Sequence, residues 1–111
     1  MKFKEDVDPR YLSAPAWLGL WKADQVHIAL VGKQAVCTST GESKHSVKRS
    51  RHYTGEYGFG FANAFDLRTW YVEVALFAER LKEELGEDYV VIIEETHIHV
   101  HWAPVFNPIR I

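Results

Sequence analysis

YVVIIEETHIHVHW, residues Tyr89–Trp102, is the stretch that decides the fold of this chain. The run Tyr89–Ile93 consists of aromatic and β-branched residues, which favour a buried strand, and we expect that strand to span Asp88–Ile93. His97–Trp102 alternates imidazoles with apolar side chains, which predicts a second strand with two different faces. Glu94–Thr96 then forms either a tight turn between the strands or the bend of one continuous strand.

Three histidines fall on one face of the second predicted strand. Successive side chains of a strand point to opposite faces, so His97, His99 and His101 project together while Ile98 and Val100 point into a core. Two glutamates come just before this strand in the sequence. Imidazoles gathered beside a carboxylate are what a metal site or an acid–base site requires. The same stretch therefore predicts a functional face.

The segments before this stretch add a helix and a strand. Apolar residues recur at helical spacing through Trp70–Leu85, and Gly86 follows where a C-terminal cap belongs, so this segment is the clearest predicted helix. Ala62–Arg68 is predicted to be a strand, and the period of two then delivers Asp66 and Arg68 to the same face.

The first part of the chain predicts a lead-in, a helix and a short strand. Met1–Arg10 is polar and is expected to be extended. A helix is expected to begin at Ser13–Pro15, where a hydroxyl can cap the first turn and proline is tolerated, and to end near Gly32. Ala35–Ser39 is predicted to be a short strand that buries Cys37, the only cysteine of the chain.

The long segment Thr40–Phe61 is predicted to be a loop. Thr40–Phe61 is rich in Gly, Ser, Lys, Arg and Tyr, and a loop of this length in a compact domain is usually functional or disordered.

The large apolar side chains of the predicted helices and strands are expected in the core or at its edge. They include Trp17, Leu18, Trp21, Ile28, Val31, Trp70 and Trp102.

Composition places the chain among small folded proteins. Its 111 residues, 47% of them hydrophobic, fit a single domain over residues 1–111. We expect a small α+β domain, with a mainly antiparallel sheet flanked by helices and a metal site at the sheet face. The formal charge of −2 gives no support for a nucleic-acid partner. Neither a signal peptide nor a membrane span is visible, so we expect a protein that is cytoplasmic as synthesised, has no membrane partner and is monomeric.

At three places the chain resembles the zinc peptidases of peptidoglycan. The matching segments are Ser50–Gly55, Ala64–Arg68 and Glu94–Val100. The group comprises the D-Ala-D-Ala carboxypeptidases and the phage endolysin peptidases, and it is related in fold to murein endopeptidases and the Hedgehog signalling domain. Its pattern is Ser-x-His-x-x-Gly-x-Ala-x-Asp, followed by a late His-x-His or Glu-x-x-His. The resemblance implies a Zn²⁺ cofactor and a peptidoglycan peptide as substrate.

The resemblance also implies a set of site residues. Carried over position by position, His52, Asp66 and His99 would be the zinc ligands. Glu94 and His97 would flank the metal as general base or transition-state stabiliser. The segment Glu94–His97 also fits the Glu-x-x-His form, in which His97 is the ligand and Glu94 the base, and both histidines could touch one metal ion. Of these alternatives, His99 as the ligand is favoured.

Further groups would handle the substrate or support the ligands. An arginine near the site, Arg49, Arg51 or Arg68, would bind a carboxylate of the substrate or steady the tetrahedral oxyanion. Arg51 is assigned to catalysis, and Ser50 and Arg68 are assigned to substrate binding. His101 is expected to lie behind the ligands or on the surface rather than to be a fourth ligand.

The chain departs from the family pattern at one point. The pattern leaves six residues between its first His and its Asp, whereas residues 53–65 separate His52 from Asp66 here. The difference corresponds to an insertion around Glu56–Ala62, which would either line a substrate cleft or obstruct it.

Three functions are compatible with these observations. The first is a zinc-dependent peptidase of the phage or prophage lysis type, which would reach the cell wall after release from the cytoplasm. The second is a catalytically silent relative, either a metal-binding or wall-binding module or a virion component, and the insertion favours this reading. The third is a cytosolic domain that uses the histidines for an unrelated metal.

Overall fold

The structure, a computed structural model, describes residues 1–40 and 62–104. The expected loop therefore lies outside the described residues except at Thr40. The elements in chain order are β1 (Lys2–Phe3), the 3-10 helix η1 (Pro9–Tyr11), α1 (Ala14–Val31), β2 (Val36–Ser39), β3 (Ala64–Arg68), α2 (Val74–Leu85), β4 (Tyr89–Ile93) and β5 (His97–Trp102).

The strands form one five-stranded sheet in the order β1-β2-β3-β5-β4. β2, β3, β5 and β4 pair antiparallel with their neighbours, and β1 joins the edge parallel to β2. The predicted α+β class with a mainly antiparallel sheet is confirmed, and the hairpin of β4 and β5 is present. Glu94–Thr96 is its turn, closed by a hydrogen bond of 2.9 Å from the Glu94 N–H to the His97 carbonyl.

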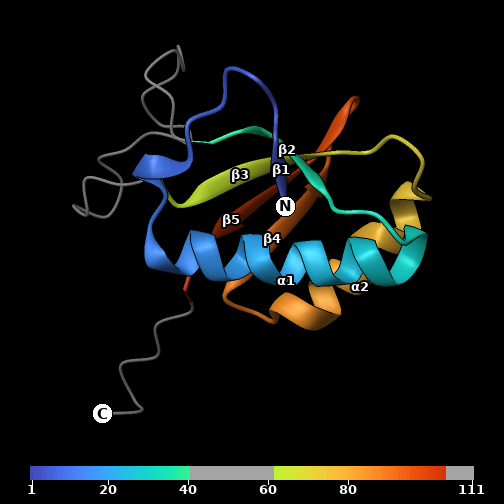
Figure 1. Ribbon diagram of the computed structural model, residues 1–111. Coiled ribbons are helices and arrows are strands. Elements are labelled where there is room, and N and C mark those ends of the chain that lie inside the picture. The colour runs from blue at the N-terminus through green and yellow to red at the C-terminus, as the bar shows by residue number, and fades with distance from the viewer. Residues whose placement is uncertain (41–61, 105–111) are drawn as a thin grey trace, which may run out of the picture.

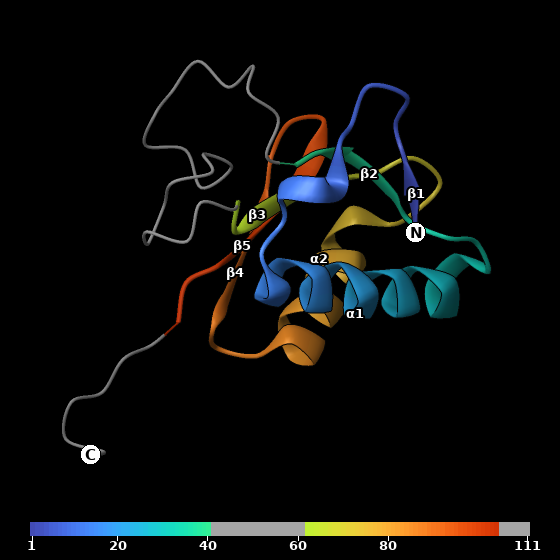
Figure 2. The ribbon, with the colours of Figure 1, turned by 60° about the vertical axis from the view of Figure 1, so that its left-hand side comes forward.

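Both helices pack on the same face of the sheet (Figures 1 and 2). Phe65, Leu67, Ile98 and Val100 of the two central strands are fully buried beneath them. Because side chains alternate along a strand, the residues between these four point to the opposite face, which neither helix covers. Neither α1 nor α2 is long and apolar enough to cross a membrane, as judged over the described residues.

Helix α1 has the predicted ends, but the predicted core face is wrong. The Ser13 hydroxyl accepts from the Ala16 N–H at 3.3 Å, and Gly32 ends the helix in a left-handed conformation with φ 73°. The buried face is made of small residues, Leu20 and two polar side chains instead: Ala16, Gly19, Leu20, Ala23, Asp24 and His27. The larger side chains expected in the core, including Trp17, Leu18, Trp21 and Ile28, are exposed.

Close approach to the sheet explains which face α1 buries. A Cβ added to Gly19 would lie 3.0 Å from the Tyr89 ring and 3.1 Å from the Phe65 ring. The Tyr89 hydroxyl also donates to the Pro15 carbonyl at 2.7 Å, so it fixes the first turn of α1 over the end of β4. Bulky tryptophans cannot fit at this distance, because protein interiors are close-packed.

Helix α2 begins four positions later than predicted, at Val74 rather than Trp70. Glu73 caps it, since its carboxylate accepts from the Ala75 N–H at 3.3 Å and the Leu76 N–H at 2.6 Å. Trp70 and Tyr71 consequently belong to the connection between β3 and α2. Trp70 is exposed there, so its assignment to the core is wrong.

The structure also tests the predictions for the N-terminal segment and for Cys37. The lead-in Met1–Arg10 is extended in the edge strand β1, as predicted, but its last two residues belong to the 3-10 helix η1. Cys37 is fully buried as predicted, and its thiol donates to the Ser39 carbonyl at 3.4 Å.

The substitution Gly19→Ala tests the close approach of α1. Helix propensity alone would make this change stabilising by roughly 1 kcal/mol. We expect it instead to lower the free energy of unfolding by about 1–3 kcal/mol, because the added methyl group overpacks the contact with Tyr89 and Phe65. Denaturant unfolding measures the difference, with Gln25→Ala on the exposed side of α1 as control. A more stable Gly19→Ala protein would contradict the packing described here.

Candidate functional site

The sheet face opposite the helices carries a carboxylate between histidines. β3 and β5 pair in a register that sets Asp66 opposite His99, Arg68 opposite His97 and Ala64 opposite His101. These residues point away from the helices, because their neighbours Phe65, Leu67, Ile98 and Val100 fill the core. We call Asp66, His97, His99 and His101 the Asp66–histidine cluster.

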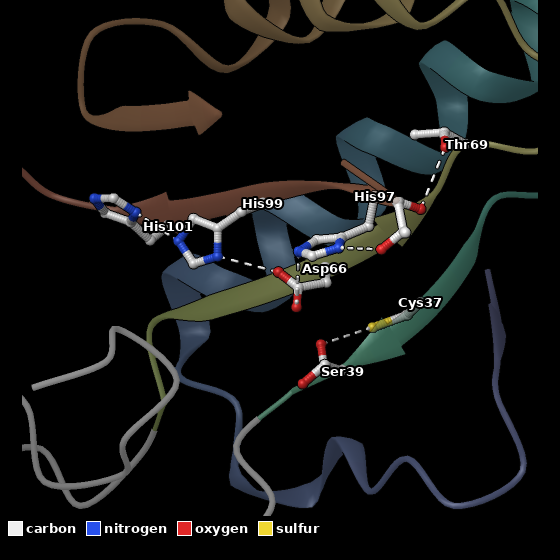
Figure 3. Close-up of polar contacts among 8 residues, drawn as sticks. Cys37, Ser39, Asp66, Thr69, His97, His99 and His101 are labelled. Atoms are coloured by element: carbon white, nitrogen blue, oxygen red, sulfur yellow. Dashed lines mark hydrogen bonds and ion pairs between the residues drawn. The ribbon is translucent and has the colours of Figure 1, made fainter. Parts of the chain in front are cut away.

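Asp66 is the centre of this cluster (Figure 3). Its Oδ1 lies 3.0 Å from His99 Nδ1, and its Oδ2 lies 3.6 Å from His97 Nε2. The first distance is a hydrogen bond, and the second is too long for one but within the range of an ion pair. The Asp66 side chain is 13% exposed and the His99 side chain 14%, so both groups are largely shielded from water.

His99 is held at both of its ring nitrogens. Besides the Asp66 contact, its Nε2 lies 2.8 Å from His101 Nδ1. An ionised carboxylate only accepts, so His99 Nδ1 carries the proton toward Asp66. In neutral His99 the Nε2 then accepts, and His101 Nδ1–H donates to it. The three residues thus form one directed chain, from His101 through His99 to Asp66.

His97 is the most exposed of the three histidines in the cluster. Its side chain is 31% exposed, about twice the fraction of His99. Its Nδ1 lies 3.1 Å from the Thr96 hydroxyl, and the Thr69 hydroxyl donates to the Thr96 carbonyl at 3.4 Å. These contacts hold the ring from the turn side and leave Nε2 directed to Asp66 (Figure 3).

The remaining predicted site residues are distributed as follows. Glu94 is exposed in the turn that leads into β5. Arg68 is half-buried on β3, and its guanidinium carbon stacks 3.9 Å from the centre of the Trp70 ring. Ser50, Arg51 and His52 lie outside the described residues.

The structure shows no metal site among the described residues. Within residues 1–40 and 62–104, no three side chains of the types His, Cys, Asp and Glu form a group that could hold a metal ion. In the hydrogen-bond chain, Asp66 Oδ1, both ring nitrogens of His99 and Nδ1 of His101 contact one another. The third ligand that the resemblance implies, His52, belongs to the segment outside this range.

Sequence reasoning placed the histidines on one face but did not identify how they are coupled. His101 is 8% exposed and bonded to His99, so it does not lie on the surface. The signal was present in the period of two, which puts His101 beside His99 on the same face. Thr69 and Thr96 carried no recognisable signal, because their role depends on the meeting of two loops.

In comparisons with known proteins, no family model, no curated protein and no solved structure matches the chain.

The directed chain predicts the tautomer of His99. In metal-free protein at neutral pH we expect His99 to carry its proton on Nδ1, because Asp66 accepts there. Long-range ¹⁵N–¹H NMR of the imidazoles distinguishes the two tautomers. The Asp66→Ala protein should lose this preference, whereas Asp6→Ala, which removes an exposed carboxylate far along the chain, should retain it. Protonation of His99 on Nε2 in the unaltered protein would contradict the assignment.

Proposed function

We propose that this chain is a zinc-dependent peptidase that hydrolyses amide bonds in peptidoglycan peptides. The observation that carries the proposal is the contact of one shielded carboxylate, Asp66, with both His97 and His99. The resemblance independently assigns these positions to a zinc centre, and the sheet register brings them within 3.0–3.6 Å of one another. Carboxylate oxygen and imidazole nitrogen are the donor types of catalytic zinc sites.

The distances favour His97 over His99 as the histidine ligand from β5. Two donors at the usual 2.0–2.1 Å from a shared zinc ion and 3.6 Å apart subtend an angle of roughly 120° at the metal, close to tetrahedral. His97 Nε2 and Asp66 Oδ2 have this separation. His99 Nδ1 instead makes a hydrogen bond of 3.0 Å to the other carboxylate oxygen. His52 would complete the ligand set.

His99 then has a positioning role. Ligating carboxylates are themselves hydrogen-bonded in metal sites, and the bond fixes their orientation. His99 donates to Asp66 Oδ1 and leaves Oδ2 available on the side of His97. His101 in turn fixes the His99 ring. The alternative in which His99 itself is the ligand requires the hydrogen bond to Asp66 to break.

With His97 as ligand, Glu94 is the residue left to act as base. The bound metal would supply a water whose pKa is lowered to about 7 and would polarise the scissile carbonyl. Glu94 would accept the proton of that water and return it to the leaving amine. Glu94 lies in the exposed turn three residues before His97, where its carboxylate is accessible to substrate. Arg68, opposite His97, would bind a carboxylate of the substrate, while Arg51 and Ser50 would act from the segment beyond the described residues.

A catalytically silent module of the same fold, which binds metal or cell wall, is the second candidate. It is favoured by the closed hydrogen-bond chain of His101, His99 and Asp66, which satisfies these groups without any ligand. A structural network of buried polar groups would have the same appearance.

Metal analysis is the first test of the proposal. We expect the purified protein to bind about one zinc ion per chain. Asp66→Ala and His97→Ala should abolish tight binding because each removes a ligand, whereas His99→Ala should weaken it by about 10–100-fold, the usual effect of losing a residue that orients a ligand. Isothermal titration with Zn²⁺ measures the affinities, with Glu95→Gln as control. A folded protein with no affinity for zinc would contradict the proposal.

Digestion of purified cell wall is the second test. The protein should release new amino groups, and mass analysis of the products identifies the bond that is cut. Glu94→Gln should reduce the rate at least 100-fold while zinc is retained, because general-base catalysis contributes about 10²–10⁴-fold. Glu95→Gln, the adjacent carboxylate, should leave the rate unchanged. Retention of zinc without any release by the unaltered protein would replace the peptidase with the silent module.

A further inference from the structure

A second candidate site lies at the end of the sheet, where the segment after α1 meets the segment after β3. It is a cavity of about 500 Å³ whose walls include Lys2, Lys33, Arg68, Trp70 and Tyr71, together with His27 beneath them. We call it the basic pocket. Its volume is in the range of pockets that hold small organic ligands.

The pocket gathers positive charge without compensating acids. Three cationic side chains, those of Lys2, Lys33 and Arg68, line it, and no Asp or Glu is among the residues of the described chain that do. Within residues 1–40 and 62–104 none of the three takes part in a salt bridge. Glu73, two positions after Tyr71, caps α2, and Asp66, two positions before Arg68, contacts His97 and His99 instead. Such a concentration of one sign of charge attracts an anion.

Aromatic rings hold two of these cations in place. The Arg68 guanidinium lies 3.9 Å from the Trp70 ring centre, and the Lys33 ammonium lies 5.3 Å from that of Tyr71. Trp70 and Tyr71 contact each other edge to face at 6.4 Å. A guanidinium stacked on a ring keeps its N–H groups free in the plane, where they can pair with both oxygens of a carboxylate. Ordering the cations in advance reduces the entropy cost of binding.

The backbone at Tyr71 is an independent sign of function. Tyr71 has φ 63°, the one positive value among the described residues other than glycine. A bulky residue rarely adopts this conformation, and strain of this kind is concentrated at binding and active sites. Tyr71 is 82% exposed, so burial of this residue does not compensate for the strain.

The other wall of the pocket is fixed from below. His27 Nδ1–H donates to the Lys33 carbonyl at 2.6 Å, since a carbonyl can only accept. The His27 ring also packs edge to face against Phe77 of α2, with centroids 5.3 Å apart. The backbone that presents the Lys33 side chain is therefore tied to the core.

Arg68, which lines the basic pocket, is also a neighbour of the Asp66–histidine cluster in the sheet. Arg68 follows Asp66 by two positions on β3, hence on the same face, and pairs with His97 on β5. A ligand bound in the pocket would extend along this row of the sheet to the cluster. The pocket and the cluster therefore suit different parts of one extended ligand.

We propose that the basic pocket binds the carboxylate groups of an acidic peptide and so holds the peptidoglycan stem peptide while its amide bond lies at the Asp66–histidine cluster. Arg68 and Lys33 pair with the carboxylates, and Trp70 and Tyr71 hold the two cations in position. The recognition of an anionic peptide stands on the pocket alone, whereas the identity of that peptide as a wall component rests on the proposed function.

Direct binding to the metal-free full chain tests this inference separately from hydrolysis. The probes are the dipeptide Ala-Glu, which carries two carboxylates, and Ala-Gln-amide, which carries none, each titrated by NMR at low ionic strength. We expect Ala-Glu to shift the signals of Arg68, Trp70 and Tyr71 and to bind at least tenfold more tightly than Ala-Gln-amide. Added salt should weaken the binding.

Variants separate the roles of charge and ring. Arg68→Gln should weaken Ala-Glu binding about tenfold, and Lys33→Gln by a smaller factor, because each removes a charged hydrogen-bond donor. Trp70→Leu keeps an apolar side chain but removes the ring beneath the guanidinium, and it should also weaken binding. Arg80→Gln, an arginine exposed on α2, should have no effect.

The possible outcomes are distinct. Equal affinity for the two dipeptides, or binding that Arg68→Gln leaves unchanged, would overturn the inference even if the protein digests cell wall. Tighter binding of adenosine monophosphate than of Ala-Glu would overturn it in favour of a nucleotide site. Selective binding of Ala-Glu by a protein that does not digest cell wall would support the pocket and refute the peptidase.

Discussion

The antiparallel register between β3 and β5 is the constraint on which the rest of the structure depends. It sets Asp66 opposite His99 and, through the alternation of side chains, places every polar group of the cluster on the face that the helices leave uncovered. The same register sets Leu67 opposite Ile98 and Phe65 opposite Val100, all four fully buried. A shift of one residue would turn the histidines into the core and the aliphatic residues out. Core packing and site geometry are therefore secured by one set of contacts.

In this register, the two carboxylate oxygens of Asp66 contact two different histidines. Oδ1 accepts from His99, which His101 orients, and Oδ2 lies 3.6 Å from His97 Nε2. This division gives the two neighbouring histidines different roles, although they are indistinguishable by spacing. It also links the cluster to the basic pocket, because Arg68 pairs with His97 and its guanidinium rests on Trp70.

The sequence predicted most of the sheet and both helix ends of α1, for local reasons. The period of two in β5, the hydroxyl of Ser13 and the glycine at position 32 each act within a few residues, so they can be recognised without the tertiary structure. The buried face of α1 could not be recognised in this way. It is chosen by the close approach to Tyr89 and Phe65, which favours Gly19 and alanines over tryptophans.

The site shows the same distinction between local and distant causes. Alternation along β5 placed three histidines on one face, but the choice of partner for each depended on β3, which lies about thirty residues earlier in the sequence. The basic pocket was not predicted at all. It depends on where α2 begins: the cap at Glu73 leaves Trp70 and Tyr71 in a connection that meets Lys33 from the far end of α1.

The division of roles at Asp66 is the central claim, and anomalous diffraction from zinc-loaded crystals tests it most directly. The account predicts one zinc ion bound by Asp66 and by His97 Nε2, each at about 2.0–2.1 Å, with His99 still donating to the second oxygen of Asp66. Zinc bound to His99 while His97 points away, or a metal position remote from Asp66, would contradict it.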